Sequence, residues 1–262
     1  MKDSHAAWFA GDRALTIGAL VALSALAWAY VLYLAWGMAH MEVGAGMAIM
    51  PRMASWQAVD LALVFAMWAI MMVATMLPSA APMLLTFAAL SRKLSPPRPR
   101  SELVAFAGGY VAVWTGFSLL AMLAQWGLLE ARLVSPAMQA STRWLSGALL
   151  LAAGLYQWTP LKQACLIRCR SPLAFLAAEW RKGQRGALVM GVRHGLFCLG
   201  CCWLAMLLLF VLGVMNVVWI AALAVFILAE KTLPGRSWLS AGGGLVFSVW
   251  GFGLLASAAA GW

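Results

Sequence analysis

The chain has 262 residues, of which 65% are hydrophobic and 10% are charged, and its formal net charge is +10. Apolar runs of about 20 residues, the length that crosses a bilayer as a helix, recur along it and exclude a water-soluble protein. Because lipid satisfies no backbone polar group, we predict an all-α, polytopic transmembrane helix bundle that forms a single integral-membrane domain over residues 1–262. The positive charge suits anionic lipid headgroups and requires no nucleic acid.

Seven apolar segments are predicted to span the membrane, at about 14–36, 58–78, 102–128, 143–163, 187–210, 214–230 and 238–258. The Lys and Arg residues between them support this number. Fifteen of the 18 fall on one side of a seven-span arrangement and three on the other, whereas six or eight spans would mix the two sets. The positive-inside rule therefore predicts a cytoplasmic N-terminus. The polar leader before the first span lacks the pattern of a cleavable signal.

The loop after the first span, at about 37–57, is predicted to lie outside and is rich in methionine. Its soft or borderline side chains make a secondary, external set of metal candidates, Met38, His40 and Met41. The alternative is that the loop dips into the membrane and uses Met as adaptable filler.

The second span carries Met72 and Met76 one turn apart, followed by Pro78 and Pro82. The helical segment is too long for one straight span, so we expect the prolines to kink or break it near the cytoplasmic face. Carbonyl groups freed there must find partners or line a cavity.

A short interfacial helix is predicted at about 172–183, between the fourth and fifth spans. Ser171 suits its N-cap, Pro172 its first position and Gly183 its end. The sixth span ends in Glu230 and Lys231. This pair is either snorkelling at the membrane edge or functional.

All five cysteines lie in two stretches, Pro160-Leu-Lys-Gln-Ala-Cys-Leu-Ile-Arg-Cys-Arg170 and His194-Gly-Leu-Phe-Cys-Leu-Gly-Cys-Cys-Trp203. On a helix, His194, Cys198 and Cys201 share one narrow arc. Cys202 points about 100° away from Cys201, which favours Cys201 as the ligand. Thiolate, thioether and imidazole groups suit Cu(I) or zinc, whereas the alternative is that the cysteines are only small buried hydrophobes.

We therefore predict a metal site in the inner half of the bilayer, with His194 and Cys198 at its core. Two ligands are too few for a structural zinc site, so copper is favoured and zinc remains possible. Cys165 and Cys169 would form an auxiliary cytoplasmic pair that exchanges the ion with a carrier. The candidate ligands are His194, Cys198, Cys201, Cys165, Cys169, Met72, Met76 and Met190.

Several segments together carry a resemblance to a known family. They are residues 157–172, Gly191-Val-Arg-His-Gly-Leu-Phe-Cys-Leu-Gly-Cys-Cys-Trp203, Met206, Gly213-Val-Met-Asn216, Glu230-Lys231, Trp68-Ala-Ile-Met-Met72 and Met76-Leu-Pro78. Over about 60–231 the chain resembles a bacterial family of predicted metal-binding integral membrane proteins, built on a domain of unknown function. The resemblance implies a metal site and a bacterial source without naming a reaction.

These features favour a multi-pass protein of the bacterial inner (cytoplasmic) membrane that handles a soft metal ion, through transport or through delivery to a membrane cuproenzyme. Its partners would be the lipid bilayer and possible metal carriers or membrane enzyme complexes. The alternative is a non-catalytic structural or assembly subunit of a larger membrane complex. No paired carboxylates, nucleophile set or phosphate loop is visible, so we identify no catalytic residue and rank an enzyme last.

Overall fold

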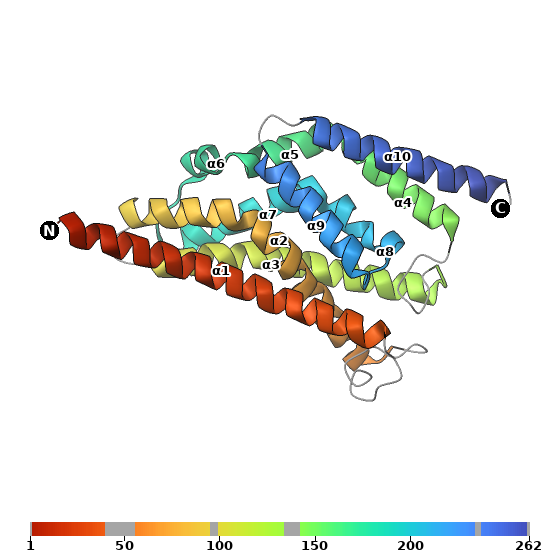
Figure 1. Ribbon diagram of the computed structural model, residues 1–262, viewed down its shortest axis with the longest axis horizontal. Coiled ribbons are helices and arrows are strands. Elements are labelled where there is room, and N and C mark those ends of the chain that lie inside the picture. The colour runs from red at the N-terminus through yellow and green to blue at the C-terminus, as the bar shows by residue number, and fades with distance from the viewer. Residues whose placement is uncertain (1, 40–55, 95–98, 134–141, 234–236, 261–262) are drawn as a thin grey trace.

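The computed structural model describes residues 2–39, 56–94, 99–133, 142–233 and 237–260. The regular structure in these residues is helical throughout, which confirms the all-α class (Figure 1). The long helices are α1 (Lys2–Ala39), α2 (Ala58–Leu94), α3 (Pro99–Glu130), α7 (Gly183–Leu207) and α10 (Ser237–Ala259). The short ones are α4 (Arg143–Tyr156), α5 (Pro160–Arg170), α6 (Pro172–Glu179), α8 (Leu209–Leu212) and α9 (Val217–Thr232).

Five helical stretches in the described part are long and apolar enough to cross a bilayer. They are Arg13–Gly37, Ala58–Leu94, Arg100–Glu130, Gly183–Leu212 and Trp238–Ala259. Each overlaps a predicted span, although Ala58–Leu94 continues well past the predicted end at residue 78. The other two predicted spans fall on α4 and α9, which have 14 and 16 residues. At about 1.5 Å per residue these helices measure about 21 and 24 Å, less than the ~30 Å hydrocarbon core.

The predicted fourth span, 143–163, is not one continuous helix. Helix α4 ends at Tyr156 and α5 begins at Pro160. Pro160 has no N–H to donate to the preceding turn, so it favours the start of a helix over its interior. The Thr159 hydroxyl caps the new helix by accepting from the backbone N–H of Lys162 at 3.3 Å. The cap and the proline together explain the break.

Helix α2 continues through both of its prolines to Leu94, so the chain does not break there. Figure 1 shows the helix bending in its middle, as expected where proline interrupts the hydrogen-bond pattern. The Met76 carbonyl beside this bend accepts a hydrogen bond from Ser79 Oγ at 2.8 Å and another from Tyr110 Oη at 3.0 Å. Side-chain hydroxyls from α2 and α3 thus bond to a backbone carbonyl of α2 close to the prolines.

The predicted helix at 172–183 begins at Pro172 as expected but is shorter than expected. Helix α6 ends at Glu179, and Ser171 makes no capping hydrogen bond. Gly183 begins α7 instead, with a φ of +77°. Phe175 and Leu176 are buried in the bundle. Leu173 on the same helix is 69% exposed, so α6 packs only part of its apolar surface against the protein.

Glycines bring two helix pairs into backbone contact. A Cβ on Gly109 of α3 would lie 2.4 Å from the carbonyl oxygen of Leu188 in α7, and one on Gly191 would lie 2.0 Å from that of Phe106. Helices α4 and α10 meet in the same way at Gly147 and Gly251. Such small residues allow close packing of helices. Helix α7, which carries three of the cysteines, is thereby fixed against α3.

Candidate metal site

Cys198 lies in the core on α7, where two polar groups from other helices reach its sulfur. Lys231 Nζ of α9 donates to Cys198 Sγ at 2.9 Å. The hydroxyl of Tyr110 on α3 lies 3.1 Å from the same sulfur. The Cys198 side chain is only 1% exposed. A buried thiol with these polar neighbours differs from a cysteine that only fills space in an apolar core.

The polar groups around Cys198 extend to α2. Lys231 Nζ also donates to Ser79 Oγ, at 3.0 Å. Ser79 and Tyr110 in turn both donate to the carbonyl oxygen of Met76. Helices α2, α3, α7 and α9 are thus joined by one hydrogen-bonded ring at the bend of α2. This ring positions the side chain of Met76 beside α7.

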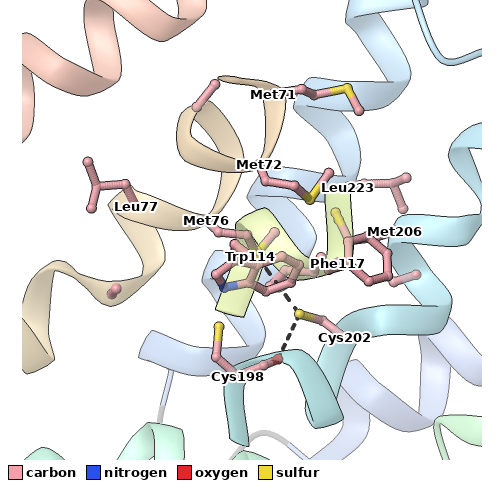
Figure 2. Packing of buried hydrophobic residues seen from close by; sticks show 14 of the residues in the cluster. Met71, Met72, Met76, Leu77, Trp114, Phe117, Cys198, Cys202, Met206 and Leu223 are labelled. Carbon is pink, nitrogen blue, oxygen red and sulfur yellow. Dashed lines mark hydrogen bonds between the residues drawn. The ribbon is translucent and has the colours of Figure 1, made fainter. Parts of the chain in front are cut away.

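Cys202, one turn beyond Cys198, faces Met76 directly. Its Sγ lies 3.9 Å from Met76 Sδ, and Figure 2 shows the two sulfur atoms pointing toward each other between α2 and α7. The Cys202 thiol also donates to the Cys198 carbonyl oxygen at 3.0 Å. Since a metal–sulfur bond is about 2.3 Å long, one ion between them could contact both sulfur atoms.

The thiols of α5 face the same part of α7. A Cβ on Gly200 would lie 2.7 Å from Cys165 Sγ, so this sulfur packs where α7 has no side chain. Cys169 hydrogen-bonds with the thiol of Cys201. The two cysteine stretches, well separated in the sequence, therefore meet along one side of α7. We call Met76, Cys165, Cys169, Cys198, Cys201 and Cys202 the sulfur cluster.

The two α5 thiols, which lie outside the spanning helices, hold their protons strongly. Burial raises the pKa of Cys165 above its ordinary value. The hydrogen bond with Cys201, followed by burial, raises the pKa of Cys169. A metal binds the thiolate form, so an ion arriving at either residue must release a proton.

His194 occupies an aromatic pocket on α7. Its ring centroid lies 5.5 Å from that of Tyr110, 5.6 Å from Phe175 and 6.2 Å from Phe106. Its Nδ1 atom is buried and has no hydrogen-bond partner among the described residues. His194 and Cys198 share Tyr110 as a neighbour, because the tyrosine ring stacks on the imidazole while its hydroxyl contacts the thiol.

The remaining predicted ligands divide into two groups. Met72 and Met190 are fully buried in the core that surrounds the sulfur cluster, and Figure 2 shows Met72 one turn from Met76. His40 and Met41 lie outside the described residues, as does the side chain of Met38. The proposed external site therefore stays a prediction.

In the part of the chain that the structure describes, no three His, Cys, Asp or Glu side chains are placed to hold one ion. Cys202 has a methionine sulfur as its neighbour instead. An ion at this position would thus have a mixed thiolate and thioether environment, which is typical of Cu(I).

Glu230 and Lys231 are buried, 2% and 7% exposed, so the interpretation that they snorkel at the membrane edge is wrong. Glu230 pairs with Lys162 of α5 at 2.8 Å. Gln157 accepts a further hydrogen bond from Lys162, and Ser240 of α10 donates to Glu230 at 2.7 Å. This charged cluster of Lys162, Glu230, Gln157 and Ser240 ties α5, α9 and α10 together. Burying both charges is tolerable because they pair and are hydrogen-bonded.

Sequence reasoning missed Cys202 as a candidate ligand, and it missed the contact of Lys231 with Cys198. The sequence disfavours Cys202 as a ligand because its side chain points about 100° away from that of Cys201. Its spacing of four residues from Cys198 could have identified it, since such residues lie on one helix face. Lys231 gives no comparable signal, because its contact with Cys198 joins residues 33 positions apart.

One known protein family matches most of the chain. The PpoB2 family, described as a copper chaperone, matches residues 65–254. This region is well over half of the chain and contains the whole sulfur cluster. No match was found among curated proteins or among solved structures. The chain belongs to the PpoB2 family of copper chaperones.

Proposed function

We propose that the protein is a membrane-embedded Cu(I) chaperone that receives the ion at Cys202, Met76 and Cys198. The observation that carries this proposal is the 3.9 Å separation of Cys202 Sγ and Met76 Sδ in the core, one turn from Cys198. The copper-chaperone description of the family supports the choice of ion. Zinc is disfavoured because its structural sites take four nitrogen or sulfur ligands.

The α5 thiols would serve as the exchange pair. Cys169 hydrogen-bonds with Cys201, and Cys165 lies against Gly200. Both are less buried than the α7 thiols. An ion could therefore pass from Cys202 and Cys201 to Cys169 by successive replacement of one sulfur ligand by the next, and then to a carrier or a membrane cuproenzyme.

His194 would act as a second ligand group close to this path. Its unpartnered Nδ1, which has no acceptor or donor among the described residues, is a buried polar atom that a ligand could satisfy. Tyr110 connects it to Cys198. We place His194 beside the sulfur cluster rather than at its centre, because aromatic rings surround its imidazole.

We also propose the seven-span arrangement in a bacterial inner membrane, with the N-terminus in the cytoplasm. Five helices of spanning length and the 15-to-3 distribution of Lys and Arg support it. The exchange pair on α5 would then lie toward the cytoplasm, where a soluble carrier could reach it. Here the reducing environment keeps the thiols free.

The test is Cu(I) affinity of the purified protein, measured by competition with a chromogenic Cu(I) chelator under reducing conditions. Met76→Leu keeps the volume but removes the thioether ligand. We expect it to weaken binding by about tenfold or more. Changing even a residue that only hydrogen-bonds to a metal ligand lowers metal affinity by this factor. Cys202→Ser should weaken binding at least as strongly.

Met83→Leu is the matched control, because Met83 is equally buried on α2 and lies outside the sulfur cluster. It should bind Cu(I) like the wild type. If Met76→Leu, Cys202→Ser and Met83→Leu all retain wild-type affinity, the sulfur cluster is not the binding site.

A further inference from the structure

Three arginines from different helices meet at one end of the bundle. Arg13 is on α1, Arg92 near the end of α2 and Arg100 at the start of α3. Figure 1 shows these helix ends together on the left. Arg92 lines two adjoining hollows between these helices, one with Arg13 and the other with Arg100. None of the described residues that line either hollow is acidic.

Arg92 has unused hydrogen-bonding capacity here. Its Nε atom is buried and has no partner among the described residues. A guanidinium group can donate several hydrogen bonds in a fork that matches a phosphate. Buried donors normally have an acceptor. An anionic oxygen placed in the hollow would supply the missing acceptor for Arg92.

The wall beside Arg92 and Arg100 is apolar. Leu15 of α1 and Leu103 and Val104 of α3 line the same hollow, and Leu15 and Val104 are 60% and 71% exposed. A ligand that suits this arrangement has an anionic head and a hydrocarbon portion. Basic pockets between membrane helices bind anionic phospholipid headgroups in this way.

We propose that these two adjoining hollows together bind one anionic phospholipid, with its phosphate at Arg92, toward Arg13 in one hollow, and an acyl chain along Leu15 and Val104 in the other. The site is separate from the sulfur cluster and shares no residue with it. In the proposed topology these helix ends lie at the cytoplasmic face. The lipid would hold the first three helices together there.

The experiment measures lipid retention by native mass spectrometry of the full chain purified in mild detergent. Protein is incubated with phosphatidylglycerol, phosphatidylcholine or inorganic phosphate. We expect retention of phosphatidylglycerol over phosphatidylcholine, and retention about fivefold weaker in Arg92→Gln, the usual effect of one basic residue at an anionic membrane surface. Arg185→Gln, which removes an exposed charge elsewhere, should match the wild type.

Val104→Trp tests the apolar wall without changing charge or a buried position. It should weaken phosphatidylglycerol retention, and it stays informative if Arg92→Gln fails to fold. Equal retention of the two lipids by the wild type, or unchanged phosphatidylglycerol retention in the folded variants, would overturn the proposal. Binding of inorganic phosphate without any lipid preference would overturn it too, because the ligand would then be a small anion.

Discussion

The ammonium group of Lys231 lies beside the Cys198 thiol, where it would be close to any cation bound to that sulfur. Lys231 Nζ lies 2.9 Å from Cys198 Sγ and is held there by Ser79. A Cu(I) ion on Cys198 must share or displace this positive charge. Repulsion between unit charges about 4 Å apart is of the order of a few kcal/mol at the dielectric typical of protein sites. In the proposed site, Lys231 would therefore limit the affinity for Cu(I).

Replacing Lys231 by Met should strengthen Cu(I) binding by about tenfold, because the competing cation is lost while the volume is nearly kept. Release to a chelator, followed by stopped-flow absorbance, should slow in proportion. Lys182→Met removes an exposed charge and serves as the control. Weaker binding in Lys231→Met would show that the lysine supports the ion rather than competing with it.

The exchange thiols should respond to pH. Burial raises the pKa of Cys165, so its thiolate fraction at neutral pH is below that of an ordinary cysteine and grows as pH rises. In a variant with Cys165 as its single cysteine, alkylation by iodoacetamide should be slow at about pH 7 and still accelerating above about pH 9, the range in which an ordinary thiol is already mostly ionised.

Leu161→Cys on the cysteine-free background supplies the comparison, because Leu161 is 63% exposed on the same helix. Its alkylation should level off at lower pH than that of Cys165. Coincident pH profiles for the two thiols would contradict the raised pKa.

At the residue scale the sequence identified segments whose thiols lie close together, but not which atoms would meet. Clustered cysteines and helical spacing led to α7 and α5. The contact of Cys202 with Met76 depends on the bend of α2, and the Lys162–Glu230 pair joins residues 68 positions apart. Neither has a local pattern, because both arise from the packing of distant helices.

Helices α3 and α7 pack closely because glycines leave space where other residues would have side chains. Gly109 lies against the backbone of Leu188 and Val192, whereas a methyl group added to its neighbour Gly108 would have no described atom within 4 Å. The two glycines thus offer a matched pair in one helix. Only Gly109 is required for the contact that fixes α7.

Gly109→Ala should therefore destabilise the protein by about 1–3 kcal/mol, the usual range for overpacking. Gly108→Ala should be neutral or stabilising, since alanine favours helix over glycine. Thermal unfolding in detergent measures both. Similar unfolding temperatures for the two variants would mean that α3 and α7 can separate without cost.

Element boundaries were predictable where composition alone decides them. The five stretches of spanning length overlap long apolar runs in the sequence. The predicted fourth span runs through Pro160 to residue 163, although Thr159 and the proline together form a helix start signal there. Helix α6 begins at Pro172 as predicted but ends at Glu179, before the predicted glycine stop.

The whole molecule carries its positive charge unevenly along the chain. Arg13, Arg92 and Arg100 lie on α1, α2 and α3 at the predicted cytoplasmic side. The segment around α6 on the same side holds Lys182 and further basic residues. Clustering of this kind orients membrane proteins with the basic side in the cytoplasm. The arginine-lined hollow and the exchange pair would then face the same compartment.

Cysteine labelling in intact cells tests this orientation on a cysteine-free background. Lys182→Cys should react with a membrane-impermeant maleimide only after the inner membrane is opened. Val59→Cys, at the start of α2 and 67% exposed, should react from outside. The reverse pattern would refute a cytoplasmic N-terminus.

The close packing of α4 with α10 has a consequence for biogenesis. The glycine face of α4 at Gly147 and Gly154 is covered by α10, which follows every other described helix out of the ribosome. Every member of the sulfur cluster is synthesised before α10. The nascent chain can therefore gather its thiols while α4 still lacks its partner, and Ser240 joins Glu230 only afterwards. The sulfur cluster can thus assemble before α10 packs against α4.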